Sequence, residues 1–296
     1  MIHNKKLQIT VAGGDLRHAH LANLLAQDGF TVYTLCLEKD VYIDSRVRIG
    51  ENAQEVLTKS NVIILPLPVT TDKVNISTPF SDKTLTLRDL LFAVPKDALI
   101  LGGMLSSEFI TKGEQIGLNL LDYLEREELA VLNAIPTAEG AIAIAMRERA
   151  STIFGSTCII TGYGRISKVL AKLLLAMGAR VIVAARKPSD LAWVKISGCE
   201  AIHISKIKEY AGKANILFNT VPAMILDEEI LSALKRDCLV VDLASKPGGV
   251  DFEMAKSLQI KTIWALSLPG KVAPISAGEM LKETVINILT ERGYIY

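Results

Sequence analysis

Residues 158–167, with the sequence CIITGYGRIS, limit the choice of fold more than any other stretch of the chain. The segment begins as an apolar strand, turns at Gly162 and Gly164, and continues into a helix that we expect over residues 167–177. A second apolar strand follows at residues 180–185. This order is typical of a dinucleotide-binding domain. The first glycine permits a tight turn, and the second lets backbone N–H groups approach a pyrophosphate at the helix N-terminus.

The end of the second strand indicates which dinucleotide would bind. An NAD site usually carries Asp or Glu about 20 residues after the glycine turn, where the carboxylate binds the ribose 2′-hydroxyl. Arg186 and Lys187 stand there instead, and a cation suits the 2′-phosphate of NADP. Ser167 replaces the third glycine of the fingerprint, so a Rossmann-like fold that binds no nucleotide is the alternative. The predicted NADP-binding residues of this segment are Gly162, Tyr163, Gly164, Arg165, Ile166, Arg186 and Lys187.

Length and composition set the broad class. A chain of 296 residues, 50% of them hydrophobic, predicts about two globular domains. The formal net charge is +1 without a long basic run, which argues against a nucleic-acid partner. No apolar segment reaches the ~18 residues of a membrane span and no signal-peptide pattern is evident, so we expect a cytoplasmic protein without membrane contact. The four cysteines are scattered without a CxxC pair, which argues against a metal site or a disulfide framework.

The first part of the chain repeats the order of strand, turn and helix. We expect a strand at residues 7–12, a helix at residues 16–27 and a strand at residues 30–37. This segment lacks a Gly-x-Gly turn, and residues 38–40 read Glu-Lys-Asp where the other segment has two cations. We therefore predict a substrate-binding domain. The expected fold class is α/β, with two Rossmann-like, doubly wound domains separated by a cleft.

The predicted domains follow from these two segments. A helix that bridges the domains is expected from Pro136, with Thr137 as N-cap and Glu139 as a first-turn acid. An amphipathic C-terminal helix is expected to pack back on the first domain. The predicted boundaries are residues 1–135 for the first domain, 136–150 for the bridging helix, 151–275 for the NADP-binding domain and 276–296 for the C-terminal helix.

Ligands in open parallel sheets bind beyond the carboxyl ends of the strands, so the loops there are candidate sites. In the first domain, the loops at residues 13–17, 66–71 and 102–107 are expected to gather on this edge.

In the second domain, a buried strand at residues 216–222 ends in Asn-Thr-x-Pro, and the next strand covers residues 239–243. Residues 268–274 are expected to form a further strand-end loop. These loops would hold the nicotinamide half of NADP. Ordinary β–α loops are the alternative, because Pro and Gly are common there. The predicted cofactor-binding residues here are Asn219, Thr220, Val221, Pro222, Leu243 and Ala244.

Motifs for nucleophilic or metal-assisted hydrolysis are missing from the sequence. There is neither a Gly-x-Ser-x-Gly elbow nor an HExxH motif, and we interpret His18, His20 and His203 as structural. No His–carboxylate pair is evident, so the cofactor is expected to supply most of the chemistry. Four cations are candidates for binding a substrate carboxylate, with surface solvation as the alternative for each: Arg17, Arg126, Lys246 and Lys271.

Six motifs stand out along the chain: GGDxR from Gly13, NxIPTxEG from Asn133, GxGR from Gly162, NTxPxMIL from Asn219, DLASxPGG from Asp242 and LPGxVAP from Leu268. Together they resemble the A subunits of dipicolinate synthase from endospore-forming bacteria, over nearly the whole chain. The resemblance implies NADP-dependent oxidation of dihydrodipicolinate to dipicolinate, a reaction on a CH–CH donor, during sporulation in the mother-cell cytoplasm. It also implies that a separate, flavoprotein-like B subunit is the partner. Assembly into a homo-oligomer is left open.

The implied substrate is a dicarboxylate, which calls for cations and N–H donors in its site. The expected substrate-binding residues are Gly13, Gly14, Asp15, Arg17, Thr137 and Ser245. Glu139 is expected to accept a proton or orient the substrate, with a purely structural helix-start acid as the alternative. Lys246 is the second predicted catalytic residue. Formation of an aromatic ring supplies much of the driving force, so a strong dedicated base is not required.

Two other functions stay open from the sequence. One is another NADP-dependent oxidoreductase, of the hydroxy-acid or shikimate dehydrogenase type. The lack of a catalytic His or Lys–Asp pair counts against it. The other is a regulatory subunit that binds NADP without catalysis.

Overall fold

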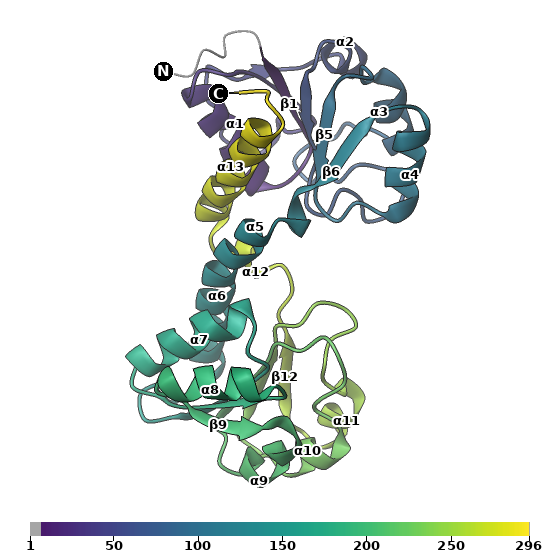
Figure 1. The fold of residues 1–296 in the computed structure, drawn as a ribbon. Coiled ribbons are helices and arrows are strands. Elements are labelled where there is room, and N and C mark those ends of the chain that lie inside the picture. Colours follow the sequence, from purple (N-terminus) through teal and green to yellow (C-terminus); the bar gives the residue numbers. More distant parts are fainter. Residues whose placement is uncertain (1–6, 296) are drawn as a thin grey trace. The chain divides into compact units, whose positions relative to one another are not determined.

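The computed structural model describes residues 7–295, and the chain divides into two compact units (Figure 1). The first unit combines Met1–Leu132 with Ala273–Tyr296, and the second comprises Asn133–Val272. Each unit contains one six-stranded sheet in which all neighbouring strands are parallel. Helices cover both faces of each sheet, so both units are Rossmann-like α/β domains, as the sequence predicts.

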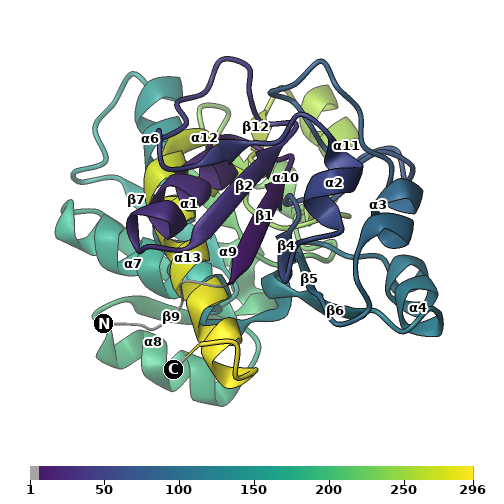
Figure 2. The ribbon, with the colours of Figure 1, turned by 90° about the horizontal axis from the view of Figure 1, so that it is seen from above.

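The first unit has the strand order β3-β2-β1-β4-β5-β6 (Figures 1 and 2). Its elements in chain order are β1 (Gln8–Ala12), α1 (Leu16–Gln27), β2 (Thr31–Leu35), β3 (Arg48–Ile49), α2 (Ala53–Leu57), β4 (Val62–Ile64), α3 (Leu87–Ala93), β5 (Leu99–Gly102), α4 (Ser107–Gln115), β6 (Asn119–Asp122), the 3-10 turn η1 (Tyr123–Glu125), α5 (Glu127–Leu132) and α13 (Pro274–Glu291).

Alternate residues of the central strands enter two different cores. In β4, Val62 and Ile64 pack with α1 and α13, whereas Ile63 packs on the other face with residues of α2, α3 and α4. Burial on both faces explains why the strands read as continuous apolar runs.

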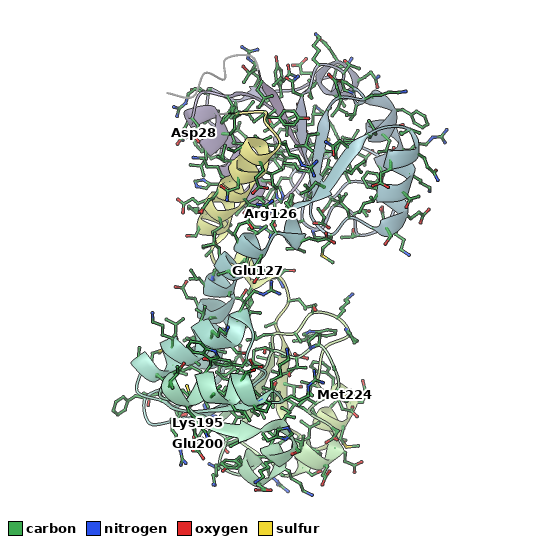
Figure 3. All side chains as sticks on the ribbon, in the orientation of Figure 1. Asp28, Arg126, Glu127, Lys195, Glu200 and Met224 are labelled. Carbon is green, nitrogen blue, oxygen red and sulfur yellow. The ribbon has the colours of Figure 1, made fainter. Side chains whose placement is uncertain are left out.

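The last helix, α13, lies against α1 within the first unit (Figure 2). Gly278 allows this close approach, because a Cβ there would lie 2.8 Å from the backbone oxygen of Arg17. Arg126 (Figure 3) adds an ion pair to Glu291 near the end of α13 and a second one to Glu128. The C-terminal segment is therefore an integral part of the first unit.

The second unit has the strand order β12-β11-β10-β7-β8-β9. Its elements in chain order are α6 (Ala134–Glu148), β7 (Thr157–Thr161), α7 (Arg165–Ala176), β8 (Arg180–Ala185), α8 (Pro188–Ile196), β9 (Glu200–His203), the 3-10 turn η2 (Ile204–Lys206), α9 (Ile207–Ala211), β10 (Ile216–Asn219), α10 (Glu228–Ser232), β11 (Leu239–Asp242), α11 (Phe252–Ser257), β12 (Lys261–Trp264) and α12 (Leu268–Val272).

Two local predictions from the sequence are wrong. Helix α6 begins at Ala134 with Asn133 as N-cap, so Thr137 is not the cap and Glu139 is not in the first turn. We expected the helix to begin at Pro136. In the structure Pro136 lies within the first turn of α6, where proline is tolerated because the N–H groups need no helical partner. The Thr137 hydroxyl instead donates to the backbone oxygen of Asn133 at 2.6 Å.

Residues 268–272 form helix α12, although Pro269 and Gly270 led us to expect a loop. This short helix packs against α6, where a Cβ on Gly140 would lie 3.3 Å from Leu268. Tertiary packing here overrides weak local helix propensity.

The helical stretch Glu127–Glu148, which comprises α5, Asn133 and α6, is long and apolar enough by length and composition to cross a membrane. Half of its most apolar window is buried within the fold, which is the usual condition of a core helix in a globular domain.

Candidate functional site

The strand order of the second unit defines a ligand edge at β7 and β10. These neighbouring strands are followed by helices on opposite faces, because α7 belongs to one core and α10 to the other. In an open parallel sheet, the crevice beyond the carboxyl ends of two such strands is where ligands bind. The segments that leave this edge are residues 162–164 and 219–222.

The glycine turn after β7 is shaped to receive an anion. Gly162 has φ +83°, and a Cβ on it would lie 2.9 Å from Thr220 Oγ1. Gly164 precedes α7 without a side-chain cap, and beyond its chain neighbours no heavy atom lies within 4 Å of where its Cβ would stand. The start of α7 is therefore open, and a helix N-terminus favours a phosphate. These residues fit the pyrophosphate of a dinucleotide.

Ser167, which replaces the third glycine of the fingerprint, is fully buried. Its Oγ lies 2.9 Å from Thr220 Oγ1, and Thr220 donates to the backbone oxygen of Thr161 at 2.7 Å. Ser167 therefore donates to Thr220, and this chain of hydrogen bonds joins the glycine turn to the loop after β10. A serine can replace the glycine because its small side chain makes this contact.

The other residues predicted around the turn point in different directions. The Tyr163 hydroxyl lies 3.0 Å from Ser197 Oγ at the end of α8, and Ile166 packs against the core. Arg165 opens α7 and is exposed.

Arg186 and Lys187 follow β8 directly and are exposed. Lys187 is the N-cap of α8, and Pro188 is the first residue of that helix. Since β8 is hydrogen-bonded to β7, its carboxyl end lies beside the glycine turn. The two cations named from the sequence therefore lie exposed at this edge of the sheet.

The loops after β10 and β11 are held together by two buried polar residues, Asn219 and Asp242, which are register partners at the strand ends. Asn219 Nδ2 donates to Asp242 Oδ1 at 2.8 Å and to the backbone oxygen of Val221 at 3.0 Å. Leu243 and Ala244 are buried behind this pair, whereas Pro222 is exposed. Asp242 was not among the predicted cofactor residues.

In the first unit, the corresponding glycine turn is closed by its own chain. The N–H of Gly13 donates to Leu35 O at 2.7 Å, and the N–H of Gly14 donates to Ser77 O at 2.9 Å. The predicted role of these two amides as donors to a substrate carboxylate therefore does not agree with the structure. The loops expected to meet here do meet, because Val69 N donates to Gly103 O at 3.0 Å.

Arg17 lies at this edge and is held on two sides. Its Nε and Nη2 donate to the Asp15 carboxylate at 2.7 to 3.0 Å, and Nη2 also donates to Leu67 O at 2.8 Å. Burial by itself raises the pKa of the Asp15 carboxyl. The hydrogen bonds from His18 and Arg17 and the positive charge of Arg17 outweigh burial and hold that pKa well below its ordinary value. The guanidinium is therefore rigid, with Nη1 as the nitrogen that makes no hydrogen bond to residues 7–295.

His18 forms a His–carboxylate pair with Asp15, contrary to the expectation that the chain has none. Its Nδ1 lies 3.3 Å from Asp15 Oδ1, and its Nε2 lies 3.3 Å from the Tyr123 hydroxyl. Tyr123 in turn donates to Leu65 O at 2.9 Å. Burial lowers the pKa of His18, and both rings are completely buried. The structural interpretation of His18 is thus consistent with its position, because its ring has no surface exposed to solvent.

The remaining predicted residues lie in different units of the chain. Ser245 and Lys246 are exposed on the loop after β11, and the Lys246–Pro247 peptide is cis. Glu139 is exposed on α6, whereas Thr137 on the same helix is buried. Arg126 is occupied by its two ion pairs, which fits a structural role better than substrate binding.

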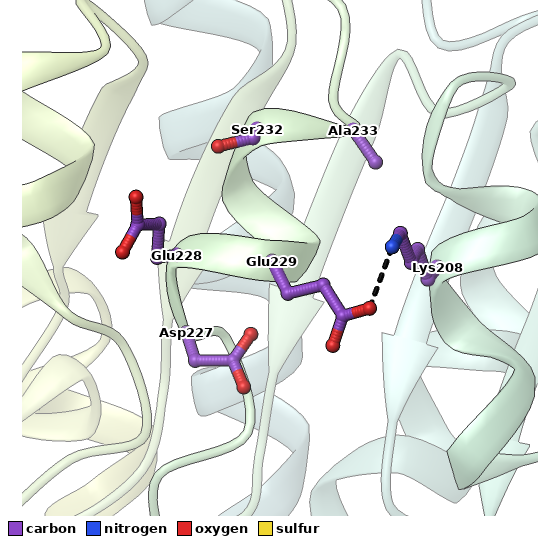
Figure 4. A pocket seen from close by; sticks show the side chains of 6 residues that line it. All are labelled: Lys208, Asp227, Glu228, Glu229, Ser232 and Ala233. Atoms are coloured by element: carbon purple, nitrogen blue, oxygen red, sulfur yellow. Dashed lines mark hydrogen bonds and ion pairs between the residues drawn. The ribbon is translucent and has the colours of Figure 1, made fainter.

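A hollow of about 640 Å³ between α9 and α10 contains none of the predicted residues (Figure 4). Lys208 pairs with Glu229 there, beside Asp227 and Glu228. In the described part of the chain, no three His, Cys, Asp or Glu side chains are grouped to hold a metal ion. Burial raises the pKa values of the Cys158 and Cys238 thiols to about 12, so neither is a thiolate near neutral pH.

Comparison with known proteins decides the family. A family model for the N-terminal domain of the dipicolinate synthase A subunit matches residues 8–124. The A subunit of dipicolinate synthase from Bacillus subtilis (strain 168) is 34% identical over 288 residues, which is 96% of each chain. The chain belongs to the family of dipicolinate synthase A subunits.

Solved structures of this family have the same fold. Dipicolinate synthase A chain from Bacillus subtilis has a TM-score of 0.88 and 32% identity, covering 97% of this chain and 96% of that one. The corresponding protein from Bacillus halodurans has a TM-score of 0.87 and 28% identity, covering 96% of this chain and 98% of that one.

The second unit matches a nucleotide-binding family as well. A model described as S-adenosyl-L-homocysteine hydrolase, NAD binding domain, covers residues 137–267. This chain therefore carries a domain for a nicotinamide dinucleotide, in agreement with the open glycine turn at Gly164.

Proposed function

We propose that this chain oxidises dihydrodipicolinate to dipicolinate with NADP, together with the flavoprotein-like B subunit, in the mother-cell cytoplasm during sporulation. The observation that carries the choice of NADP is the pair of exposed cations, Arg186 and Lys187, beside an open glycine turn. The family name supports dipicolinate as the product. The resemblance of the six sequence motifs to this family supports the dihydrodipicolinate substrate, the B subunit and the role in sporulation.

The cofactor would be held by four strand ends of the second unit, those of β7, β8, β10 and β11. The amides at the start of α7 would bind the pyrophosphate, and Arg186 would bind the 2′-phosphate. The loops after β10 and β11, beginning at Asn219 and Asp242, would hold the nicotinamide half. When bound, NADP would supply the acceptor for the hydride that the substrate loses.

The reaction removes one hydride and one proton from a dihydropyridine ring and leaves an aromatic pyridine. The substrate carries two carboxylates, so it needs two cationic contacts. Arg17 can supply only a weakened cationic contact, because the Asp15 carboxylate already balances its charge. We assign the Nη1 edge of Arg17 to a substrate carboxylate, and Lys246 stays a catalytic residue predicted from the sequence.

Glu139 is the proposed proton acceptor. It is exposed and carries a free carboxylate within the described chain, so it can take up the proton that leaves the ring and pass it to water. A modest base is sufficient because aromatisation drives the step.

The test is turnover of dihydrodipicolinate by the purified chain with NADP, with and without the B subunit, followed by NADPH absorbance and by product formation. We expect equal amounts of NADPH and dipicolinate. Turnover of 2-hydroxy acids or shikimate-type alcohols instead would identify a different oxidoreductase. Binding of NADP without turnover, even with the B subunit, would identify a regulatory subunit.

A further inference from the structure

The carboxylate of Asp242 is completely buried at the carboxyl end of β11. Oδ1 accepts hydrogen bonds from Asn219 Nδ2 at 2.8 Å and from the N–H of Ala244 at 3.0 Å. Oδ2 accepts from the N–H of Gly249 at 2.9 Å. All three partners are N–H donors, so neither oxygen has an acceptor to which a protonated acid would donate. The geometry is that of an ionised carboxylate.

The negative charge of Asp242 is not neutralised by a cation. Within residues 7–295, no Lys, Arg or His side chain forms an ion pair with it, and its three donors are neutral amides. The nearest cation in sequence, Lys246, is exposed on the loop that follows. A buried charge held only by neutral dipoles keeps a negative potential around it.

The backbone around Asp242 is packed to keep this arrangement. A Cβ on Gly249 would lie 2.4 Å from Asn219 Nδ2 and 2.5 Å from Val221 O. The backbone oxygen of Gly249 accepts from the N–H groups of Ile225 and Leu226 at 3.0 and 2.9 Å. The two loops that follow β10 and β11 are therefore fixed to each other, with the carboxylate between them.

We propose that Asp242 is a positioning and specificity-determining residue that favours the oxidised, positively charged nicotinamide ring over the neutral, reduced ring. The inference rests on the proposed function, which assigns the nicotinamide half to the loops after β10 and β11. A fixed negative charge behind those loops stabilises a cationic ring and leaves the affinity for the neutral ring almost unchanged. Such a preference suits an enzyme that must bind the oxidant first and release the reduced product.

A purely structural role of Asp242 makes a different prediction. If the carboxylate only fixed the loops, its loss would weaken both forms of the cofactor alike. The ratio of the two dissociation constants, Kd for NADPH over Kd for NADP, therefore separates charge from structure.

The experiment measures this ratio for the full-length chain and for Asp242→Asn, with thermal unfolding as a check of the fold. We expect the ratio to fall by about tenfold in the variant, on the order of the effect of one unit charge at close range. Asp251→Asn is the matched control, because Asp251 caps α11 in the same unit by accepting from Met254 N. The control variant should keep the wild-type ratio.

An unchanged ratio in folded Asp242→Asn would overturn the proposal while leaving the proposed function intact. If the wild-type chain binds neither form, the proposed function fails and this inference fails with it. If the variant does not fold, the wild-type chain decides, with 2′-phospho-ADP-ribose as the ligand that lacks the ring. The cationic ring should add more affinity to that ligand than the dihydro ring does, and the opposite order would overturn the proposal.

Discussion

The two glycine turns of this chain both follow the first strand of a Rossmann-like unit, but they serve different ends. Gly14 in the first unit has φ +105°, and a Cβ there would lie 2.4 Å from the ring of His18. Gly164 in the second unit has ordinary backbone angles, and beyond its chain neighbours nothing lies within 4 Å of its missing Cβ. Gly14 is needed because the ring of His18 packs where a Cβ would stand. Gly164 leaves the space in front of α7 open for a phosphate.

This difference shows how two domains of the same architecture can bind different ligands. In the first unit, the N–H of Gly14 donates to Ser77 O, and residues 76–78 fill the space beside Gly13. What remains at that edge is the side chain of Arg17. In the second unit, the helix N-terminus itself stays available, so backbone groups can bind a phosphate.

The largest effect on cofactor binding is expected when the open turn is filled. Gly164→Val should weaken NADP binding by more than about 100-fold, roughly 2.7 kcal/mol, because its side chain would occupy the space in front of α7. The melting temperature should change little, since Gly164 is exposed and its φ is −86°. Titration with NADPH by nicotinamide fluorescence measures the first effect, and thermal unfolding measures the second.

Gly212→Val is the control for this change, because Gly212 is also exposed in the second unit and caps α9, away from the strand ends. Normal NADPH binding by Gly164→Val would show that the turn after β7 is not the phosphate site.

Filling the closed turn should give the opposite pattern. Gly14→Ala should lower the free energy of unfolding by about 3 kcal/mol, because it adds a strained backbone angle and a clash with His18. Gly29→Ala is the matched control: its φ is +93° but its Cβ would meet no atom within 4 Å, so about 1 kcal/mol is expected. Urea denaturation measures both, and equal losses would contradict the packing argument.

Removal of the Arg17 side chain tests directly whether the first unit binds substrate and the second unit binds the cofactor. Arg17→Ala should raise KM for dihydrodipicolinate by about 30-fold, roughly 2 kcal/mol, and leave the Kd for NADPH unchanged. It should also lower stability, because Asp15 loses its partner. Arg126→Ala, which breaks ion pairs elsewhere in the same unit, should lower stability without a change in KM. A weaker Kd for NADPH in Arg17→Ala would contradict the placement of the substrate edge.

The smallest of these effects concerns cofactor choice. Arg186→Asp should weaken NADPH binding by about tenfold, roughly 1.4 kcal/mol, and shift the preference toward NADH. Arg180→Asp makes the same charge change at the other end of β8, where Arg180 pairs with Glu200, and should not alter the preference. An unchanged preference for NADPH over NADH in Arg186→Asp would show that Arg186 does not bind the 2′-phosphate.

Much of the fold could be predicted because its signals are local. The helix expected at residues 16–27 and the strand expected at residues 180–185 agree with α1 and β8 in both bounds. Buried parallel strands read as apolar runs, and glycine marks the turns. Helix α12 escaped prediction because its Pro and Gly are helical only through packing against α6.

The parts of the site that the sequence did not reveal depend on contacts across long separations. Asp242 meets Asn219 only because β10 and β11 are in register, and Tyr123 meets His18 only within the folded first unit. The Asp15–His18 pair had a local signal, since residues three apart at a helix start can form a reciprocal capping pair. The roles of Glu139, Lys246 and Ser245 stay predictions.

The central proposal is that the second unit binds NADP. The open turn at Gly164 would bind the pyrophosphate, and Arg186 would bind the 2′-phosphate. It is tested most directly by titrating the full-length chain with NADPH and with NADH while following nicotinamide fluorescence. The proposed function predicts tight binding of NADPH and binding of NADH at least about tenfold weaker. Equal binding of the two, or binding of neither, would contradict the assignment of Arg186 and the open turn at Gly164.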